Sequence, residues 1–255
     1  MLMRRFLLST ACLFAAANVY GGDLKMQFVF DGDVPAPAPI DVNRDTAFCG
    51  KHDLTDESLV VNPKNKGIKN VVVYVYTGRG GSDLPDSPEK NDTHELANED
   101  CRFEPRVVLT QVGDTLKVTN PDPVGHNANL NFLKNDAKNL MIPASQEKDV
   151  ELEESEPAPI PVECNIHPWM RAYVVVLDHP YAAVSDEDGN LTIKGLPNEE
   201  LTFRVWMEAA DGALSEVEVD GKTQEWKRNR FEVDIKDGVN DLGVVKIKPD
   251  QVKLP

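Results

Sequence analysis

The residue types best suited to redox chemistry lie together in residues 164–170, which read Cys-Asn-Ile-His-Pro-Trp-Met. This segment offers a thiolate, an imidazole and a thioether, and a second imidazole, His126, lies 38 residues before Cys164. Two nitrogens, one thiolate and a weak axial thioether are the ligand set of a blue-copper electron-transfer site. The set suits both Cu(I) and Cu(II), so little has to move when an electron arrives. We therefore expect His126, Cys164, His167 and Met170 to bind one type 1 copper ion.

Other interpretations of these residues have to be weighed against copper. A single His in a β-protein is usually a surface or core residue, and a buried Cys is usually a small hydrophobe. Cys-x₂-His could be half of a zinc site, but structural zinc needs two more Cys or His nearby, and the other His are isolated. Cys164 could instead form a disulfide. The joint pattern favours copper.

The first residues predict an exported protein. Residues 1–22 carry two arginines followed by a short apolar run and small residues, which is typical of a signal peptide. We expect the mature chain in a periplasm or outside the cell, where disulfides persist. Cys12 would leave with the signal. Cys49 and Cys101 are natural partners if Cys164 binds metal, and two free thiols are the alternative.

Short strands are the elements that could position the site. The sequence has short runs of β-branched residues, or of alternating apolar and polar residues, and Gly, Pro, Asn and Asp separate these runs. This pattern predicts an all-β protein built as sandwiches or barrels. It restarts after Leu177, so we expect domains at 23–178 and 179–255. The expected strands are Leu24–Phe30, Asn70–Tyr76, Arg106–Gln111, Thr115–Asn120, Asp149–Glu153, Tyr173–Leu177, Tyr181–Val184, Leu191–Ile193, Leu201–Trp206, Ser215–Val219, Arg230–Ile235 and Val244–Ile247.

Charge excludes one large class of function. The chain has 255 residues, with 43 acids, 27 bases and a formal net charge of −16. Such a chain does not bind nucleic acid or an anionic membrane through bulk charge. Residues 77–100 and 151–160 are acidic, without a core pattern, and we expect both to be solvated loops.

The ligand motif resembles that of the cupredoxins, amicyanin and plastocyanin above all. Cys-x₂-His-Pro-x-Met at 164–170 is similar to the short amicyanin ligand loop, and His126 followed by Asn127 resembles the family's His-Asn element. The resemblance implies a Greek-key sandwich over roughly residues 102–177. It also implies that Asn127 tethers the ligand loop and donates a hydrogen bond toward the Cys sulfur.

The same resemblance implies a function. Copper would carry single electrons between redox proteins, with His167 as the exposed electron port and Pro168 and Trp169 as an apolar docking rim. The acidic surface would steer a basic partner such as a cytochrome. The alternative is a non-redox binding module, copper store or scaffold. We expect no enzyme, because the chain has five His and no His-x-His for a catalytic copper.

The second half resembles a different kind of module. The run AVSDEDGNLTIKGLPNEELTFRVW, within residues 180–248, is similar to carboxypeptidase-regulatory-like sandwiches. That resemblance implies a small second β-sandwich and no chemistry.

Overall fold

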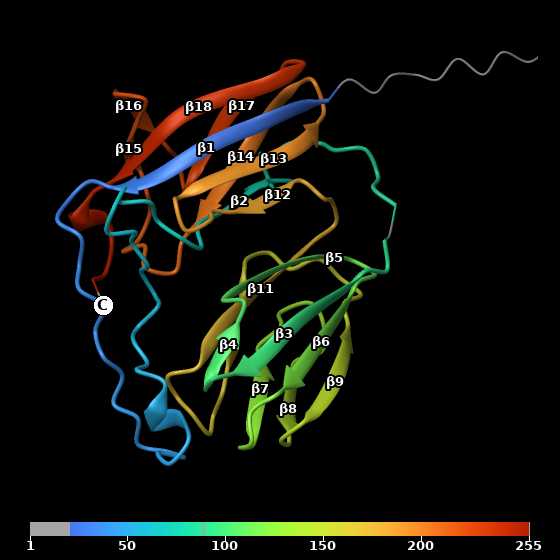
Figure 1. Ribbon diagram of the computed structural model, residues 1–255. Coiled ribbons are helices and arrows are strands. Elements are labelled where there is room, and N and C mark those ends of the chain that lie inside the picture. Colours follow the sequence, from blue (N-terminus) through green and yellow to red (C-terminus); the bar gives the residue numbers. More distant parts are fainter. Residues whose placement is uncertain (1–20, 89, 255) are drawn as a thin grey trace, which may run out of the picture.

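The computed structural model describes residues 21–88 and 90–254 and consists of two β-sandwiches, one above the other in Figure 1. The predicted all-β class is confirmed, because the helical elements are two short 3-10 turns, η1 (Cys49–Lys51) and η2 (Pro249–Gln251), in the described part of the chain. The predicted signal peptide, residues 1–22, lies outside the described residues except for Gly21 and Gly22. No helix in the described part is long and apolar enough to cross a membrane.

The lower sandwich carries all four predicted ligands. One of its sheets has the order β5-β11-β10-β7-β8 and the other β4-β3-β6-β9, and side chains from both sheets form one apolar core. The strands are β3 (Thr93–Glu99), β4 (Arg102–Glu104), β5 (Val107–Gln111), β6 (Thr115–Asn120), β7 (His126–Leu130), β8 (Lys138–Ile142), β9 (Gln146–Glu151), β10 (Ile160–Glu163) and β11 (Arg171–Leu177).

The upper sandwich combines the beginning of the described chain with its end. Its sheets have the orders β13-β1-β18-β15-β16 and β12-β2-β14-β17, around a second core. The strands are β1 (Gly22–Phe30), β2 (Val72–Val75), β12 (Ala182–Val184), β13 (Asn190–Leu196), β14 (Glu200–Trp206), β15 (Glu216–Val219), β16 (Lys222–Glu225), β17 (Arg230–Asp234) and β18 (Gly238–Ile247).

This pairing differs from the predicted division at residue 178. β1 pairs with β13 and β18, and β2 pairs with β12 and β14, so the first two strands belong with the second half of the chain. The chain leaves the upper sandwich after β2, builds the lower one, and returns at β12. The physical reason is that β1 and β2 bury their apolar faces in the upper core, with Phe28 and Val73 fully buried there.

The two sandwiches pack through strands that are buried on both faces. In β11, Val174 and Val176 point into the lower core, whereas Val175 and Leu177 join a separate cluster between the sandwiches. In β2, Val72 and Tyr74 reach that same cluster. The sequences of these strands are therefore nearly continuous apolar runs, as expected for strands that are covered on both faces.

The two acidic stretches are less exposed than predicted. Residues 93–99 of the first form β3, which pairs with β4 and β6. In the second, Glu156 is buried and its carboxylate accepts hydrogen bonds from the backbone N–H groups of Leu133, Lys134 and Asn135. The expectation of two solvated loops is therefore wrong for these parts. Residues 93–99 pair as a strand. Glu156 is buried because its carboxylate accepts hydrogen bonds from backbone N–H groups.

Phe28 tests the assignment of β1 to the upper sandwich. Phe28→Ala should lower the free energy of unfolding by about 3–5 kcal/mol through cavity formation. Hydrogen exchange should accelerate in β13, β14 and β18. Accelerated exchange confined to β6, β7 and β9 would contradict the pairing.

Candidate metal centre

Two neighbouring strands of one sheet bring the predicted ligands together. His126 is the first residue of β7, and Cys164 directly follows β10, which pairs antiparallel with β7. His167 and Met170 lie in the turn that leads from β10 to β11. Because the beginning of β7 lies beside the end of β10, residues 38 positions apart in the sequence meet at one end of the sheet.

The turn itself is held by short-range hydrogen bonds. The N–H of Met170 donates to the carbonyl of His167 at 2.9 Å, and the N–H of Cys164 donates to the carbonyl of Met170 at 3.2 Å. The N–H of His167 points at the sulfur of Cys164, 3.4 Å away. Pro168, with its fixed φ, stiffens the turn between them.

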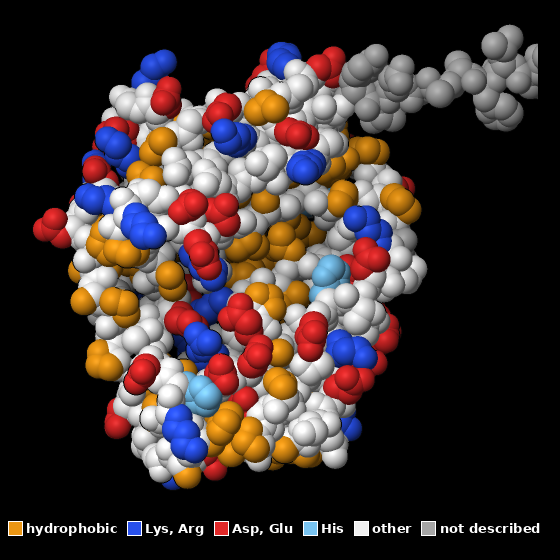
Figure 2. Space-filling model, in the orientation of Figure 1, with side chains coloured by type: hydrophobic (Ala, Val, Ile, Leu, Met, Phe, Trp, Pro, Cys, Tyr) orange, Lys and Arg blue, Asp and Glu red, His pale blue; other side chains and the backbone are white. Residues whose placement is uncertain are grey.

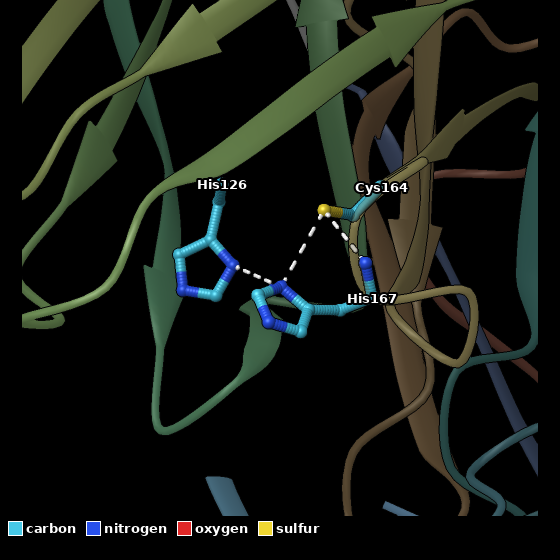
Figure 3. Close-up of side chains that lie close together, drawn as sticks. All are labelled: His126, Cys164 and His167. Atoms are coloured by element: carbon cyan, nitrogen blue, oxygen red, sulfur yellow. Dashed lines mark hydrogen bonds between the residues drawn. The ribbon is translucent and has the colours of Figure 1, made fainter. Parts of the chain in front are cut away.

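Three donor atoms converge on one buried point, as Figure 3 shows. His126, Cys164 and His167 each offer an atom within 4.8 Å of the others, and all three are buried. The two Nδ1 atoms lie 2.9 Å apart, and the sulfur lies 3.8 Å from Nδ1 of His167. Cys164 is the free cysteine of the described residues.

Each imidazole is oriented by a carboxylate on its far side. Nε2 of His126 lies 2.9 Å from a carboxylate oxygen of Asp122, and Nε2 of His167 lies 2.8 Å from one of Asp45. An ionised carboxylate only accepts hydrogen bonds, so each Nε2 carries the proton and donates it. In a neutral ring, Nδ1 is then left with a lone pair, which is the arrangement that metal-binding histidines use. A protonated ring also carries a proton on Nδ1 and can donate it to the sulfur of Cys164.

These hydrogen bonds create a need for positive charge between the rings. Two Nδ1 lone pairs at 2.9 Å repel each other unless a proton or a metal cation lies between them. The nearby thiolate adds negative charge to the same point. The donor set of two imidazoles and one thiolate therefore fits a cation of the soft-to-borderline kind, copper or zinc.

The sulfur is prepared to act as a thiolate. Burial raises the pKa of the Cys164 thiol, but hydrogen bonds from His126, His167 and the backbone N–H groups of Asn127 and His167 outweigh it and lower the pKa to about 6. Burial would lower the pKa of His126, yet its hydrogen bonds to Asp122 and Cys164 give a net rise. Burial likewise opposes ionisation of Asp122, but bonds from His126, Cys101 and Asp100 lower its pKa overall.

The other two predicted residues also lie at the site. Met170 is buried in the same apolar cluster as Cys164. The side-chain oxygen of Asn127 accepts the N–H of Asn165 at 2.8 Å, which ties β7 to the ligand loop. The backbone N–H of Asn127 points at the Cys164 sulfur at 3.5 Å, so Asn127 donates to the sulfur through its main chain, beside the N–H of His167.

A loop from outside the lower sandwich covers His167. This cap, residues 39–56, is closed at its base by a hydrogen bond from Ile40 N–H to the carbonyl of Leu54, and it places Asp45 over the ring edge. His167 is fully buried. The expectation that His167 is an exposed electron port is therefore wrong, because the cap occupies the surface that the port would need.

The cap is fixed covalently, and residues in the left-handed backbone region lie within it and at its anchor point. The predicted disulfide Cys49–Cys101 is confirmed, with a Cα–Cα distance of 5.5 Å. Asp45, Asp53 and Cys101 adopt positive φ, which non-glycine residues rarely do, and such residues cluster at functional sites. The cap also rests on Trp169, whose indole N–H donates to the carbonyl of Cys101 at 3.1 Å.

Asp122 and Asp45 were not recognised from the sequence as members of the site. Asp122 lies four residues before His126, and an acid so close to a predicted ligand is a usable signal. Asp45 lies 122 residues before His167, and nothing local in the sequence connects them.

Comparison with solved structures finds similarity to copper proteins. An oxidised single-residue mutant of amicyanin is 23% identical over 34% of this chain and 84% of its own, with a TM-score of 0.31. A reduced amicyanin mutant is 20% identical over 41% and 97%, with a TM-score of 0.30. The copper-containing nitrite reductase of Thermus scotoductus is 18% identical over 39% and 24%, with a TM-score of 0.30.

No family model and no curated protein matches the chain. The structural similarities are low, with TM-scores of 0.30 to 0.31. The likeness of the upper sandwich to carboxypeptidase-regulatory-like modules stays a prediction.

The thiol of Cys164 should titrate near pH 6 in metal-free protein, well below the ordinary value of 9.0. Its thiolate should therefore dominate at neutral pH and disappear as the pH falls through 6. The ultraviolet absorbance of the thiolate, taken as the difference from Cys164→Ser, measures this. A midpoint above pH 8 would show that the imidazoles do not stabilise the thiolate.

Loosening the cap should expose Cys164. In metal-free Asp45→Ala, alkylation of Cys164 at about pH 9, where the thiol is ionised in each variant, should accelerate roughly tenfold, because a charge-assisted hydrogen bond is lost. Peptide mass mapping separates Cys164 from Cys12. Asp41→Ala, an exposed acid on the same cap, is the control and should react like the parent. Equal rates in both variants would mean that Asp45 does not hold the cap closed.

Proposed function

We propose that the chain is a type 1 copper protein that carries single electrons. The observation that supports this best is the convergence of two Nδ1 atoms and one thiolate sulfur at a buried point, with both Nε2 atoms hydrogen-bonded to carboxylates. His126, Cys164 and His167 would hold the ion, and Met170 would supply a weak thioether contact. Copper supplies a one-electron couple there.

The protein's own residues keep that couple reversible. Asp122 and Asp45 hold the rings in one tautomer, and Asn127 holds the loop against β7, so the donors stay in place in either oxidation state. The apolar core around Cys164 excludes water. We also propose that the chain catalyses no reaction of its own and that it works in a periplasm or outside the cell with a redox protein, for which a basic cytochrome stays a prediction.

Copper in place of zinc is favoured by the number of strong donors and by the buried thioether of Met170 nearby. Structural zinc usually takes four strong ligands, whereas this group of described residues offers three. A set of three strong ligands with a weak fourth contact is the arrangement of blue copper.

Copper loading tests the proposal directly. Protein purified with Cu(II) should be intensely blue, Cys164→Ala should be colourless, and Met170→Leu should stay blue with a changed reduction potential. Asn165→Ala, in the same loop but outside the proposed ligand set, is the control. A colourless parent that binds one zinc more tightly than copper would refute the proposal.

Burial of His167 favours one alternative, a copper store without a redox role. Electrochemistry separates the two. A carrier should give a reversible one-electron wave, with reduction potential independent of scan direction. A store should bind Cu(I) tightly and give no reversible wave.

A further inference from the structure

A cleft of about 560 Å³ lies beside the ligand loop, between the two sandwiches. Three parts of the chain form it: the base of the cap, the lower sandwich around β4 and the ligand loop, and the upper sandwich around Glu208 and Lys253. Figure 2 shows Lys, Arg, Asp and Glu side chains gathered in a hollow between the two halves of the molecule. The volume suits a small molecule, since such sites typically measure about 300–1,000 Å³.

Trp169 connects this cleft to the metal centre. Its ring centroid lies 5.2 Å from that of His167, and the half-buried Trp169 also lines the cleft together with Pro168. With the far edge of His167 closed by Asp45, Trp169 is an aromatic side chain that contacts both a site imidazole and the cleft. The flat indole face also suits a planar ring.

Three basic side chains of the cleft are paired with carboxylates of the cleft or of its surroundings. Arg106 makes two hydrogen bonds of 2.9 Å to the carboxylate of Glu208, across the boundary between the sandwiches. Arg171 is paired with Glu163, and Lys253 lies 3.7 Å from Asp211. These pairs offset the charges of Arg106, Arg171 and Lys253, while the carboxylate of Asp56, also on the wall, accepts the N–H of Ser58.

Arg102 is also paired, with Glu57, but it keeps guanidinium donors that no protein group binds in the described structure. Its Nη1 donates to Glu57 at 3.1 Å, but its Nε is buried without a hydrogen-bond partner in the described structure. That Nε is shielded from solvent, so a ligand in the cleft meets the outer Nη groups of Arg102, whose side chain is 41% exposed. A planar guanidinium with free donors binds carboxylates well.

We propose that this cleft binds a small planar organic anion, with its carboxylate at Arg102 and its ring near Trp169. The inference rests on the proposed function in one respect. A molecule bound in the cleft would be separated from the copper site by the indole ring of Trp169. It also gives the upper sandwich a role, because Glu208 and Lys253 complete the wall of the cleft.

Calorimetric titration of the full chain with 4-hydroxybenzoate and its neutral counterpart 4-hydroxybenzamide tests the proposal. The two probes have nearly the same shape and differ in charge. The anion should bind about tenfold or more tightly, because its hydrogen bonds to the guanidinium are charge-assisted. Arg102→Gln should remove that preference, and the exposed Arg228→Gln should keep it.

A second variant guards against misfolding of the first. Glu57→Gln removes the charge that competes for Arg102, so it should bind the anion more tightly, a gain that a damaged protein would not show. Binding of both probes with equal affinity, binding of neither, or a preference unchanged in Arg102→Gln would overturn the proposal. Anion binding by a protein that takes up no copper would instead leave the cleft intact and refute the copper function.

Discussion

The site depends on two carboxylate–imidazole hydrogen bonds that meet it from opposite sides. Asp122 and Asp45 hold the protons of His126 and His167 at Nε2, and this turns both Nδ1 lone pairs toward Cys164. Without these bonds, each ring could take the other tautomer, and the rings would have no reason to face each other at 2.9 Å. The lowered pKa of Cys164 follows from the same arrangement, because the polarised rings and the backbone N–H groups favour the thiolate.

The rest of the chain supports these bonds in different ways. Asp122 comes from the lower sandwich itself, and its second role is to accept the N–H groups of Asp100 and Cys101. Asp45 comes from the cap, which the Cys49–Cys101 disulfide joins to that same region. One sulfur bridge thus links the cap that closes His167 to the turn that positions Asp122. The upper sandwich anchors the chain on both sides of the lower one, since β1 and β2 precede it and β12 follows it.

The sequence was most informative where the relevant residues are close together. The ligand loop at 164–170 identified three of the proposed ligands, and strands such as Thr115–Asn120 were predicted with their observed ends. β3 was missed because it buries few apolar side chains, with a pattern in which Leu96 is the main one. The division at residue 178 did not follow the sheets, since strand partners more than a hundred residues apart leave no local pattern. The hydrogen bond between Asp45 and His167 was missed for the same reason, because these residues lie 122 positions apart and meet only in the folded chain.

X-ray absorption spectroscopy of the copper-loaded protein tests the central claim most directly, because it reports the atoms bound to the metal. A type 1 site should show one short copper–sulfur bond and two copper–imidazole nitrogen bonds in both oxidation states, with little change between them. A copper ion bound by nitrogen and oxygen alone, without the sulfur of Cys164, would contradict it.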